Sequence, residues 1–404
     1  MTNIVFDTSR RQLLQGAAAI LAATLAPAAA FAQTGPIRLG GVVPLTGGNS
    51  YDGPPTAKVM KGLVDEINAA GGIHGRKLEI FIEDDQSNPE AAVRATRTLI
   101  DVQKVIAICC SGSSAVTTAI APLCWESKTI LTTVSGADSI TKLPHQGYIL
   151  RTQPNTTFQA QRVSAYLLEN GAKRVGFMSA PTPFANSIYD TMVSILKPAG
   201  VETMLSIYDD KKTSFRSEVD EMMRFRPDTM TFAGYLPDTI VLLKDLYRAN
   251  YAGKKVAYGF AFNQSIVDGV PPEVSEGIMA ISPSAAIGSK SFAKVATLTG
   301  MAVPTPYAAQ IYDHINILAL TMAASKAEPT GLMIHGSVRN ITQGANGVKV
   351  DNFADGAKLL AEGKTIDYDG ASGPCDFNAI GDITDARFRY EVVKGGKLTL
   401  SKIS

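Results

Sequence analysis

The sequence has 404 residues and a nearly balanced charge, with 38 Lys and Arg against 37 Asp and Glu. At roughly 150 residues per domain, this length predicts two domains or slightly more. The apolar fraction of 45% allows a sizeable core, and the balanced charge argues against a nucleic-acid binder, which needs clustered Lys and Arg to hold phosphates.

Residues 1–32 are typical of an export signal. Arg10 and Arg11 precede an apolar run that ends in a small-x-small tripeptide at 30–32, so we expect cleavage before Gln33. The paired arginines favour the twin-arginine route, with a Sec signal or a membrane anchor as the alternatives. Because the apolar run is short for a span and no later segment is long enough, we expect a soluble periplasmic product.

The chain after this signal alternates apolar strands with amphipathic helices. In the first expected helix, Val59, Leu63 and Ile67 recur on one face, and the Gly pair at 71–72 is typical of a helix end. The strands expected in this half are 37–43, 78–82, 105–109 and 129–133, and the helices are 58–69, 89–101 and 114–126.

The same alternation restarts near residue 157. Strands are expected at 175–178, 202–208, 229–232 and 256–259, and helices at 157–170, 187–197, 215–225 and 237–249. Later helices near 306–325 and 331–343 precede short strands around 387–393 and 397–400. Such alternation predicts parallel sheets covered on both faces, so the two runs predict an α/β fold with two doubly wound domains. In open sheets of this kind, ligands bind beyond the carboxyl ends of the strands.

Little in the sequence indicates an enzyme or a metal centre. The segment 111–113 lacks the flanking G-x-S-x-G pattern of a nucleophile elbow, and no Walker or G-x-G-x-x-G phosphate loop is present. The four His and four Cys form no C-x-x-C or H-E-x-x-H pattern. We therefore expect no enzyme activity, no cofactor and no metal.

The cysteines leave two alternatives open. They are Cys109, Cys110, Cys124 and Cys375. The periplasm permits disulfides, so Cys124 could bridge to Cys109 or Cys110, and the other alternative is a set of buried free thiols.

Five motifs, in chain order and at sensible spacing, carry a resemblance to a known family. They lie at 43–48 (VPLTGG), 65–78 (DEINAAGGIHGRKL), 84–89 (DDQSNP), 149–152 (ILRT) and 373–382 (GPCDFNAIGD). Together they resemble the leucine/isoleucine/valine-type periplasmic binding proteins that serve ABC importers. The resemblance extends from about Ile37 to the C-terminus.

The resemblance implies a type I periplasmic binding protein fold, in which two lobes joined by three hinge crossovers close on a ligand. Lobe one is expected at 36–151 plus 283–370, and lobe two at 152–282 plus 371–404. The crossovers are expected near 151–153, 282–283 and 369–370. The implied function is capture of a solute for an ABC permease by a monomer, and the alternative is a ligand-sensing protein that presents its ligand to a membrane receptor.

A carboxylate-binding site is expected where 111–114 joins a strand to a helix, because unpaired N–H groups at a helix N-terminus suit an anion. Ser114 matches the family's carboxylate-binding Ser, with Ser113 beside it. The alternative is that these serines only cap the helix. In the next strand-to-helix loop, Ser135 and Ala137 occupy the places from which relatives hold an α-amino acid head group, unless this loop is a plain connection.

The family's partner for an α-ammonium group is missing. Relatives that bind α-amino acids have a Glu where this sequence has Ala261, and a buried ammonium without that partner would cost roughly 3–5 kcal/mol. Four aromatic residues are expected either to line the ligand or to pack in the core: Phe184, Tyr235, Phe260 and Phe262. Tyr51 and Asp52 are expected to reach the cleft from lobe one, and Asp52 could then serve an ammonium. We therefore expect a carboxylate ligand, with an aromatic acid first, an aliphatic acid second and a free α-amino acid third.

Overall fold

The computed structural model describes residues 35–110 and 112–404. It divides into two units, Met1–Gly35 and Pro36–Ser404, and every element below belongs to the second. The export signal expected at 1–32 lies outside the described residues. Among the helices that the structure does describe, none has the length and apolar character needed to cross a membrane.

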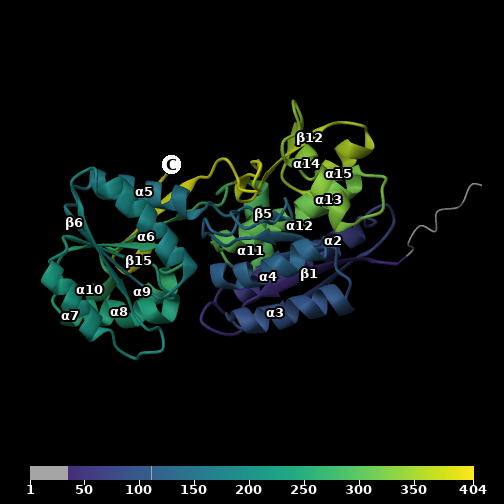
Figure 1. Cartoon of the computed structure of the whole chain (residues 1–404). Helices are drawn as coiled ribbons and strands as arrows, with labels where there is room; N and C mark the ends of the chain where they lie inside the picture. The colour runs from purple at the N-terminus through teal and green to yellow at the C-terminus, as the bar shows by residue number, and fades with distance from the viewer. Residues whose placement is uncertain (1–34, 111) are drawn as a thin grey trace, which may run out of the picture. The chain divides into compact units, whose positions relative to one another are not determined.

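The first sheet has five strands in the order β2-β1-β3-β4-β5, and all neighbours run parallel. Figure 1 labels its strands β1 and β5. The strands are β1 (Ile37–Val43), β2 (Leu78–Asp84), β3 (Ala107–Cys110), β4 (Ile130–Thr133) and β5 (Ile149–Arg151). Its helices are α2 (Gly53–Ala69), α3 (Pro89–Arg97) with a π-helical extension η1 (Thr98–Val102), and α4 (Ser114–Glu126). Since the order reverses beside β1, the loops after β1 and β3 lie on either side of the switch point where such sheets bind ligands.

Helices cover both faces of this sheet. Successive residues of a strand point to opposite faces, so each face packs against a different set of helices. Leu39 and Val43 pack in one cluster with α2 and with α12 (Pro306–Ala324), whereas Val42 packs in another with α3 and α4. The near-continuous apolar runs that identified these strands in the sequence therefore reflect burial on two sides.

The second sheet has seven strands in the order β15-β14-β10-β9-β8-β6-β7. Strands β6 to β10 pair in parallel, and β14 and β15 add antiparallel. The strands are β6 (Arg174–Ser179), β7 (Glu202–Ile207), β8 (Thr229–Phe232), β9 (Lys254–Tyr258), β10 (Met279–Pro283), β14 (Phe388–Lys394) and β15 (Lys397–Ile403). The helices are α5 (Thr156–Glu169), α6 (Pro183–Leu196), α7 (Arg216–Phe225), α8 (Leu236–Arg248), α9 (Gln264–Asp268) and α10 (Pro272–Ser275).

The segment between β10 and β14 adds helices and a small sheet. The helices are α11 (Lys290–Thr299), α12, α13 (Gly331–Ser337), α14 (Arg339–Thr342) and α15 (Phe353–Ala361). The sheet has the order β11-β12-β13, with β11 (Val348–Val350), β12 (Ile366–Gly370) and β13 (Gly373–Pro374). Because α11 and α12 contact α2, this segment packs on the first sheet's helices.

The predicted α/β fold of parallel, helix-covered sheets is confirmed, and the differences concern individual elements. The sequence did not indicate β10, α11, α15 or the small sheet. Helix α2 begins at Gly53 rather than 58, and α6 begins at Pro183 rather than 187, because both start with Pro in the first turn. The helix expected at 331–343 divides into α13 and α14. The boundaries expected for the two lobes remain a prediction.

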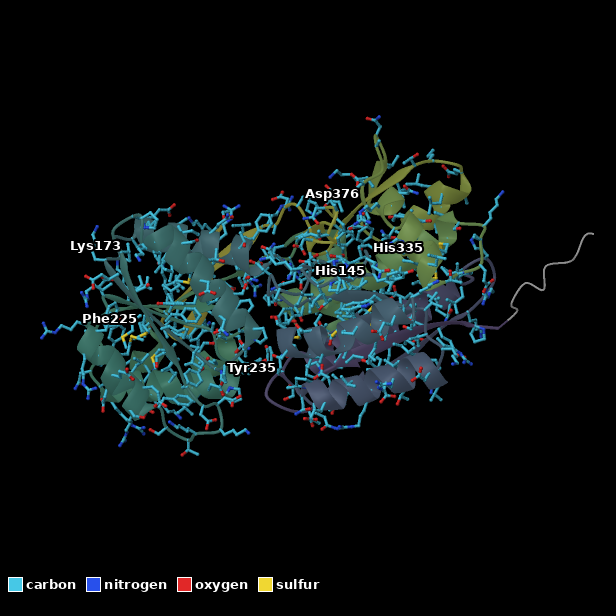
Figure 2. All side chains as sticks on the ribbon, viewed as in Figure 1. His145, Lys173, Phe225, Tyr235, His335 and Asp376 are labelled. Carbon is cyan, nitrogen blue, oxygen red and sulfur yellow. The ribbon has the colours of Figure 1, made fainter. Side chains whose placement is uncertain are left out.

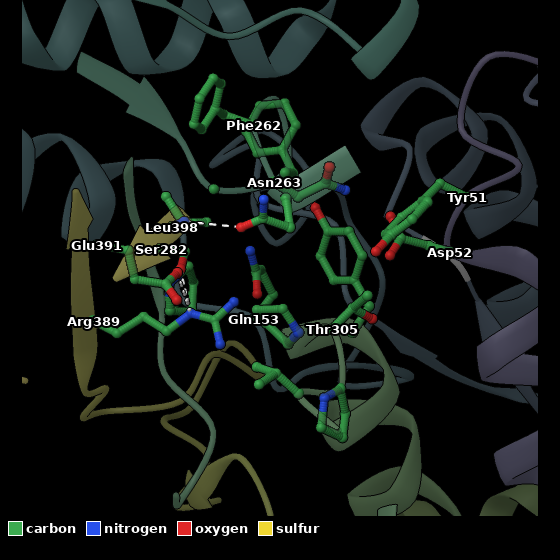
Figure 3. Close-up of a pocket in the computed structure, with 18 residues that line it drawn as sticks. Tyr51, Asp52, Gln153, Phe262, Asn263, Ser282, Thr305, Arg389, Glu391 and Leu398 are labelled. Atoms are coloured by element: carbon green, nitrogen blue, oxygen red, sulfur yellow. Dashed lines mark hydrogen bonds and ion pairs between the residues drawn. The ribbon is translucent and has the colours of Figure 1, made fainter. Parts of the chain in front are cut away.

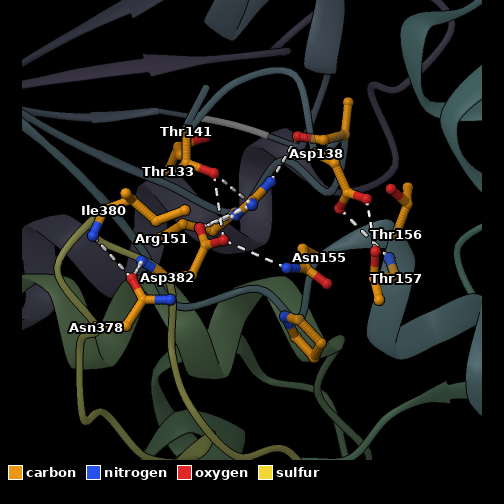
Figure 4. A network of polar contacts seen from close by, with 12 residues as sticks. Thr133, Asp138, Thr141, Arg151, Asn155, Thr156, Thr157, Asn378, Ile380 and Asp382 are labelled. Carbon is orange, nitrogen blue, oxygen red and sulfur yellow. Dashed lines mark hydrogen bonds and ion pairs between the residues drawn. The ribbon is translucent and has the colours of Figure 1, made fainter. Parts of the chain in front are cut away.

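A buried polar network joins segments far apart in the sequence (Figure 4). Arg151, at the end of β5, pairs with Asp382 through Nη2 at 2.7 Å and Nε at 2.9 Å. The same guanidinium donates to the Ala137 carbonyl and to Thr141 Oγ1, and Asn155 donates to Asp382. The network lies at the first expected crossover, so the chain entering α5 is fastened to the chain that leads into β14.

The disulfide that the sequence left open does not form. Cys109, Cys124 and Cys375 are free and buried, and Cys110 is buried with its Sγ 3.4 Å from Thr117 Oγ1. Burial raises the pKa of the Cys109 thiol to about 12. The buried-thiol alternative is therefore correct for Cys124, the residue that was expected to bridge.

Candidate ligand-binding site

Loops at the carboxyl ends of strands from both large sheets enclose a small cavity. From the first sheet come Gly112, Ser114 and Gly136, and from the second come Phe184 and Tyr235. Its volume is about 30 Å³. Asn49, Gln153, Thr182, Phe260 and Tyr307 complete the polar and aromatic part of the lining. This is the position that the fold favours for a ligand, because it lies beyond the strand ends of two open sheets.

Ser113 and Ser114 have different partners at the start of α4. Ser113 is the N-cap residue, and its Oγ accepts from the Val116 N–H. Ser114 lies in the first helical turn and lines the cavity, and its Oγ accepts from the Ala137 N–H at 3.2 Å. The Ser114 hydroxyl proton is therefore available for donation to an acceptor in the cavity, and the helix N-terminus adds partial positive charge.

Aromatic rings form the opposite wall of the small cavity. Phe184, in the first turn of α6, packs edge-to-face on Phe260 with ring centroids 4.9 Å apart. Phe184 also approaches the first sheet's loops closely, since a Cβ atom added at Gly136 would lie 2.8 Å from its ring. Tyr235, labelled in Figure 2, lies at the N-cap of α8. Among the described residues that line this cavity there is no Asp or Glu.

A second pocket, drawn in Figure 3, is larger than the small cavity. Its volume is about 270 Å³. The two share Gln153, Phe260 and Tyr307, so they lie next to each other. Tyr51, Asp52, Phe262, Asn263, Arg389 and Glu391 are among the residues that line only the larger pocket. Its volume is near the lower end of the range for small-molecule sites, about 300–1,000 Å³.

The charged residues of the larger pocket are Arg389, Glu391 and Asp52. Arg389 Nε pairs with Glu391 Oε2 at 3.0 Å and donates to Ser282 Oγ at 3.0 Å. Arg389 Nη1 is buried and has no hydrogen-bond partner among the described residues. Burial raises the pKa of Asp52 to about 7, against the opposing effect of a hydrogen bond with Thr305. The pocket therefore contains one compensated ion pair and one carboxyl that is protonated in part near neutral pH.

The site residues predicted from the sequence do not all line the same pocket. Ser114, Phe184, Tyr235 and Phe260 line the small cavity, whereas Tyr51, Phe260 and Phe262 line the larger pocket. Ser113 caps α4. Ligand contact by these residues remains a prediction.

Besides Ser113, three predicted site residues line neither pocket. Ser135, Ala137 and Ala261 are completely buried. The Ser135 hydroxyl lies 2.7 Å from Thr117 Oγ1, the Ala137 carbonyl accepts from Arg151, and the Ala261 N–H donates to the Tyr258 carbonyl. Their positions were inferred from the family's loops, and these internal contacts account for their burial.

Sequence reasoning missed several lining residues. Gln153 lies at the first expected crossover, yet nothing in its neighbourhood marked it as facing a cavity. Tyr307 follows Pro306 at the start of α12, where only a helix start was evident. Arg389 and Glu391 alternate on β14, and this period-2 spacing indicated a shared strand face without indicating what the face meets. His145 and His335, labelled in Figure 2, line neither pocket.

Comparison with known proteins identifies the class to which this fold and this site belong. The family model described as "Periplasmic binding protein" matches residues 36–382, so the chain belongs to the periplasmic binding protein family. The relatives and solved structures below support the branched-chain amino acid type within it. Members of this family are substrate-binding proteins of transport type rather than enzymes.

Two relatives cover almost the whole chain. The chemotactic signal transduction system substrate-binding protein BasB of Halobacterium salinarum is 24% identical, over 90% of this chain and 91% of its own length. The Leu/Ile/Val-binding protein BraC3 of Rhizobium johnstonii is 25% identical, over 95% of this chain and 99% of its own length.

Solved structures share the fold. The leucine-binding protein LivK of Thermotoga maritima superposes with a TM-score of 0.76 at 20% identity, covering 91% of this chain and 98% of its own. A solute-binding protein of an ABC transporter from Rhodopseudomonas palustris BisB5, in complex with 3,4-dihydroxybenzoic acid, has a TM-score of 0.73 at 18% identity, covering 91% and 97%.

Proposed function

We propose that the mature protein is the periplasmic solute-binding subunit of an ABC importer and captures a small carboxylate between its two lobes. In this proposal the chain is exported by its N-terminal signal, acts as a monomer and delivers the ligand to an inner-membrane permease. The family supports the transport role, and the Rhodopseudomonas palustris structure, with its bound dihydroxybenzoic acid, supports an aromatic acid as one ligand class within this fold.

The observation that carries the ligand class is the lining of the small cavity. It combines the Ser114 hydroxyl at a helix N-terminus with the rings of Phe184, Tyr235 and Phe260, and no Asp or Glu is found among its described lining residues. A carboxylate is therefore provided for, whereas an α-ammonium would be buried without an opposite charge beside it, which costs roughly 3–5 kcal/mol. We propose an aromatic acid first, an aliphatic acid second and a free α-amino acid third.

The work of such a subunit is capture and closure, and no covalent bond is made or broken. Since the cavity is lined from both large sheets, a ligand that touches both sides binds the closed arrangement more tightly than an open one. Closure then shields the ligand from water, and the closed protein is the form that a permease would receive.

A panel of matched pairs tests this ligand class by titration calorimetry. Phenylpyruvate is compared with phenylalanine, and 2-oxoisocaproate with leucine, so that each pair differs at the α-amino group. We expect the oxo acids to bind more tightly. Tighter binding of both amino acids would refute the proposal and restore the amino acids that several relatives are named for.

A sensing role is the second candidate, and the chemotactic relative BasB is the observation that favours it. The two roles differ in the partner that meets the closed protein. Stimulation of ATP hydrolysis by the reconstituted permease would support transport, whereas ligand-dependent binding to a membrane receptor without such stimulation would support sensing.

A further inference from the structure

The small cavity is too small for the ligand class proposed above. About 30 Å³ is space for one or two water molecules, whereas a cavity that admits benzene measures about 150 Å³. The larger pocket of about 270 Å³ lies next to it, because Gln153, Phe260 and Tyr307 line both. A ligand with its carboxylate at Ser114 would therefore place its remaining atoms in the larger pocket.

The larger pocket offers both apolar and polar surface to those atoms. Phe260, Phe262 and Tyr307 provide rings against which a flat body can pack. Arg389 reaches into the same pocket from β14 and Asn263 from the N-terminus of α9 (Figure 3). A ligand that extends into this pocket thus meets hydrogen-bonding groups as well as rings.

Arg389 is the group in this pocket whose hydrogen bonds are incomplete. Its Nε has two partners, Glu391 and Ser282, but Nη1 is buried without one among the described residues. A buried donor that lacks an acceptor is unfavourable, so an acceptor supplied by the ligand would relieve this cost.

The charge balance decides what kind of acceptor fits. Glu391 already compensates Arg389, and Asp52 adds a second carboxyl to the same lining. A further carboxylate would bring negative charge to a pocket without a spare positive one among its described lining residues. A hydroxyl or carbonyl oxygen accepts from the guanidinium without adding charge.

We propose that the larger pocket is a second subsite that receives the end of the ligand remote from the carboxylate, and that Arg389 determines specificity there by donating to a neutral oxygen. The ligand class is then an elongated aromatic acid with a hydroxyl or carbonyl group at the far end. This inference rests on the proposed function, because it assumes that the carboxylate binds at Ser114.

Calorimetry with three pairs of acids tests the subsite. The pairs are benzoate, phenylacetate and 3-phenylpropanoate, each with and without a 4-hydroxyl group, so the span is varied along with the far oxygen. In the wild-type protein we expect the hydroxyl to strengthen binding about ten- to hundredfold in at least one pair, which corresponds to one hydrogen bond with a charged donor. The 4-carboxylate analogue of that acid should bind more weakly than the hydroxyl compound.

Two variants separate recognition from folding. Arg389→Met removes the donor but leaves Glu391 without its partner, so Arg389→Met combined with Glu391→Met is prepared as well, because it removes both buried charges. In each folded variant the hydroxyl preference, measured as the ratio of the two dissociation constants in a pair, should fall to about one.

The outcomes that overturn the inference are distinct from those that overturn the proposed function. A hydroxyl preference that survives both variants, an equal loss for all acids, or tightest binding by the dicarboxylate would each refute the role of Arg389, although the acids still bind. If no acid binds and the amino acids do, the proposed function fails and this inference fails with it.

Discussion

At the scale of single residues, Ser113 and Ser114 form a matched pair. They are adjacent, but the Ser113 hydroxyl caps α4 whereas the Ser114 hydroxyl lines the small cavity. Ser114→Ala should weaken ligand binding about ten- to hundredfold, because one hydrogen bond to a charged carboxylate is lost. Titration calorimetry on the folded variant measures this.

The control is Ser113→Ala, which removes the cap and the hydrogen bond between the Ser113 and Tyr235 side chains. It should lower the free energy of unfolding by about 1 kcal/mol and weaken binding less than Ser114→Ala does. If Ser114→Ala leaves the dissociation constant unchanged, or if Ser113→Ala proves the more damaging to binding, Ser114 does not contact the carboxylate.

The raised pKa of Asp52 predicts that the free energy of unfolding depends on pH. Burial raises its pKa from an ordinary value of 3.8 to about 7, so the folded state holds this proton more tightly than the unfolded state. The stabilisation is complete below about pH 4 and is lost as the pH rises through 7, which amounts to about 3 kcal/mol between pH 5 and 8. The other titratable groups of this lining, which the test leaves unaltered, are Tyr51, Tyr307, Arg389 and Glu391.

Urea unfolding of wild type and of Asp52→Asn at pH 5 and pH 8 measures this effect. The difference in unfolding free energy between the two proteins should shift by about 3 kcal/mol between these pH values, with the variant the less pH-sensitive. Asp313, whose pKa burial also raises to about 7, contributes equally to both proteins and cancels. Parallel pH profiles would show that Asp52 ionises freely in the folded protein.

At the scale of elements, the sequence predicts most of the fold because burial on two sides leaves long apolar runs. It misplaces the starts of α2 and α6, since Pro in a first helical turn resembles a loop signal in the sequence. It also misses β5, a buried strand of three residues that is too short to show any period.

The candidate site, like the fold, could be predicted from the sequence only in part. Ser114 and Tyr235 follow strands directly, so the topology of an open sheet places them at the carboxyl edge and their role could be anticipated. Arg389 could not be anticipated, because it enters the pocket only through the antiparallel pairing of β14 with β10, where it lies opposite Ser282. Local sequence does not encode that register.

The Arg151–Asp382 ion pair connects β5 to the distant C-terminal segment, so its loss is expected to destabilise the fold. Both side chains are buried, so Asp382→Ala leaves the guanidinium without an opposite charge and should lower the free energy of unfolding by about 3–5 kcal/mol. Urea denaturation measures the loss.

The control is Glu79→Ala, which removes the exposed Arg38–Glu79 pair of the first sheet. Its expected effect is below about 1 kcal/mol. A similar small loss in both variants would mean that the other partners of Arg151, Thr141 and the Ala137 carbonyl, are sufficient to hold it.

At the scale of the whole molecule, closure on the ligand is the expected response. A ligand that contacts residues of both sheets stabilises the closed arrangement, so saturation should lower the radius of gyration and raise the melting temperature. Small-angle scattering and thermal unfolding measure the two effects.

Ser114→Ala at the same ligand concentration provides the control, since weaker binding should reduce both changes together. A rise in melting temperature without any change in scattering would mean that the ligand binds without bringing the lobes together.

The burial of the native thiols has a practical consequence. Cys109, Cys110, Cys124 and Cys375 are all buried, so a maleimide reagent has little access to them in the folded protein. Val303 lines the larger pocket and is 55% exposed. A cysteine introduced there could be labelled selectively with an environment-sensitive fluorophore, whose emission would change as the pocket fills. The native cysteines therefore do not have to be replaced before such a reporter is made.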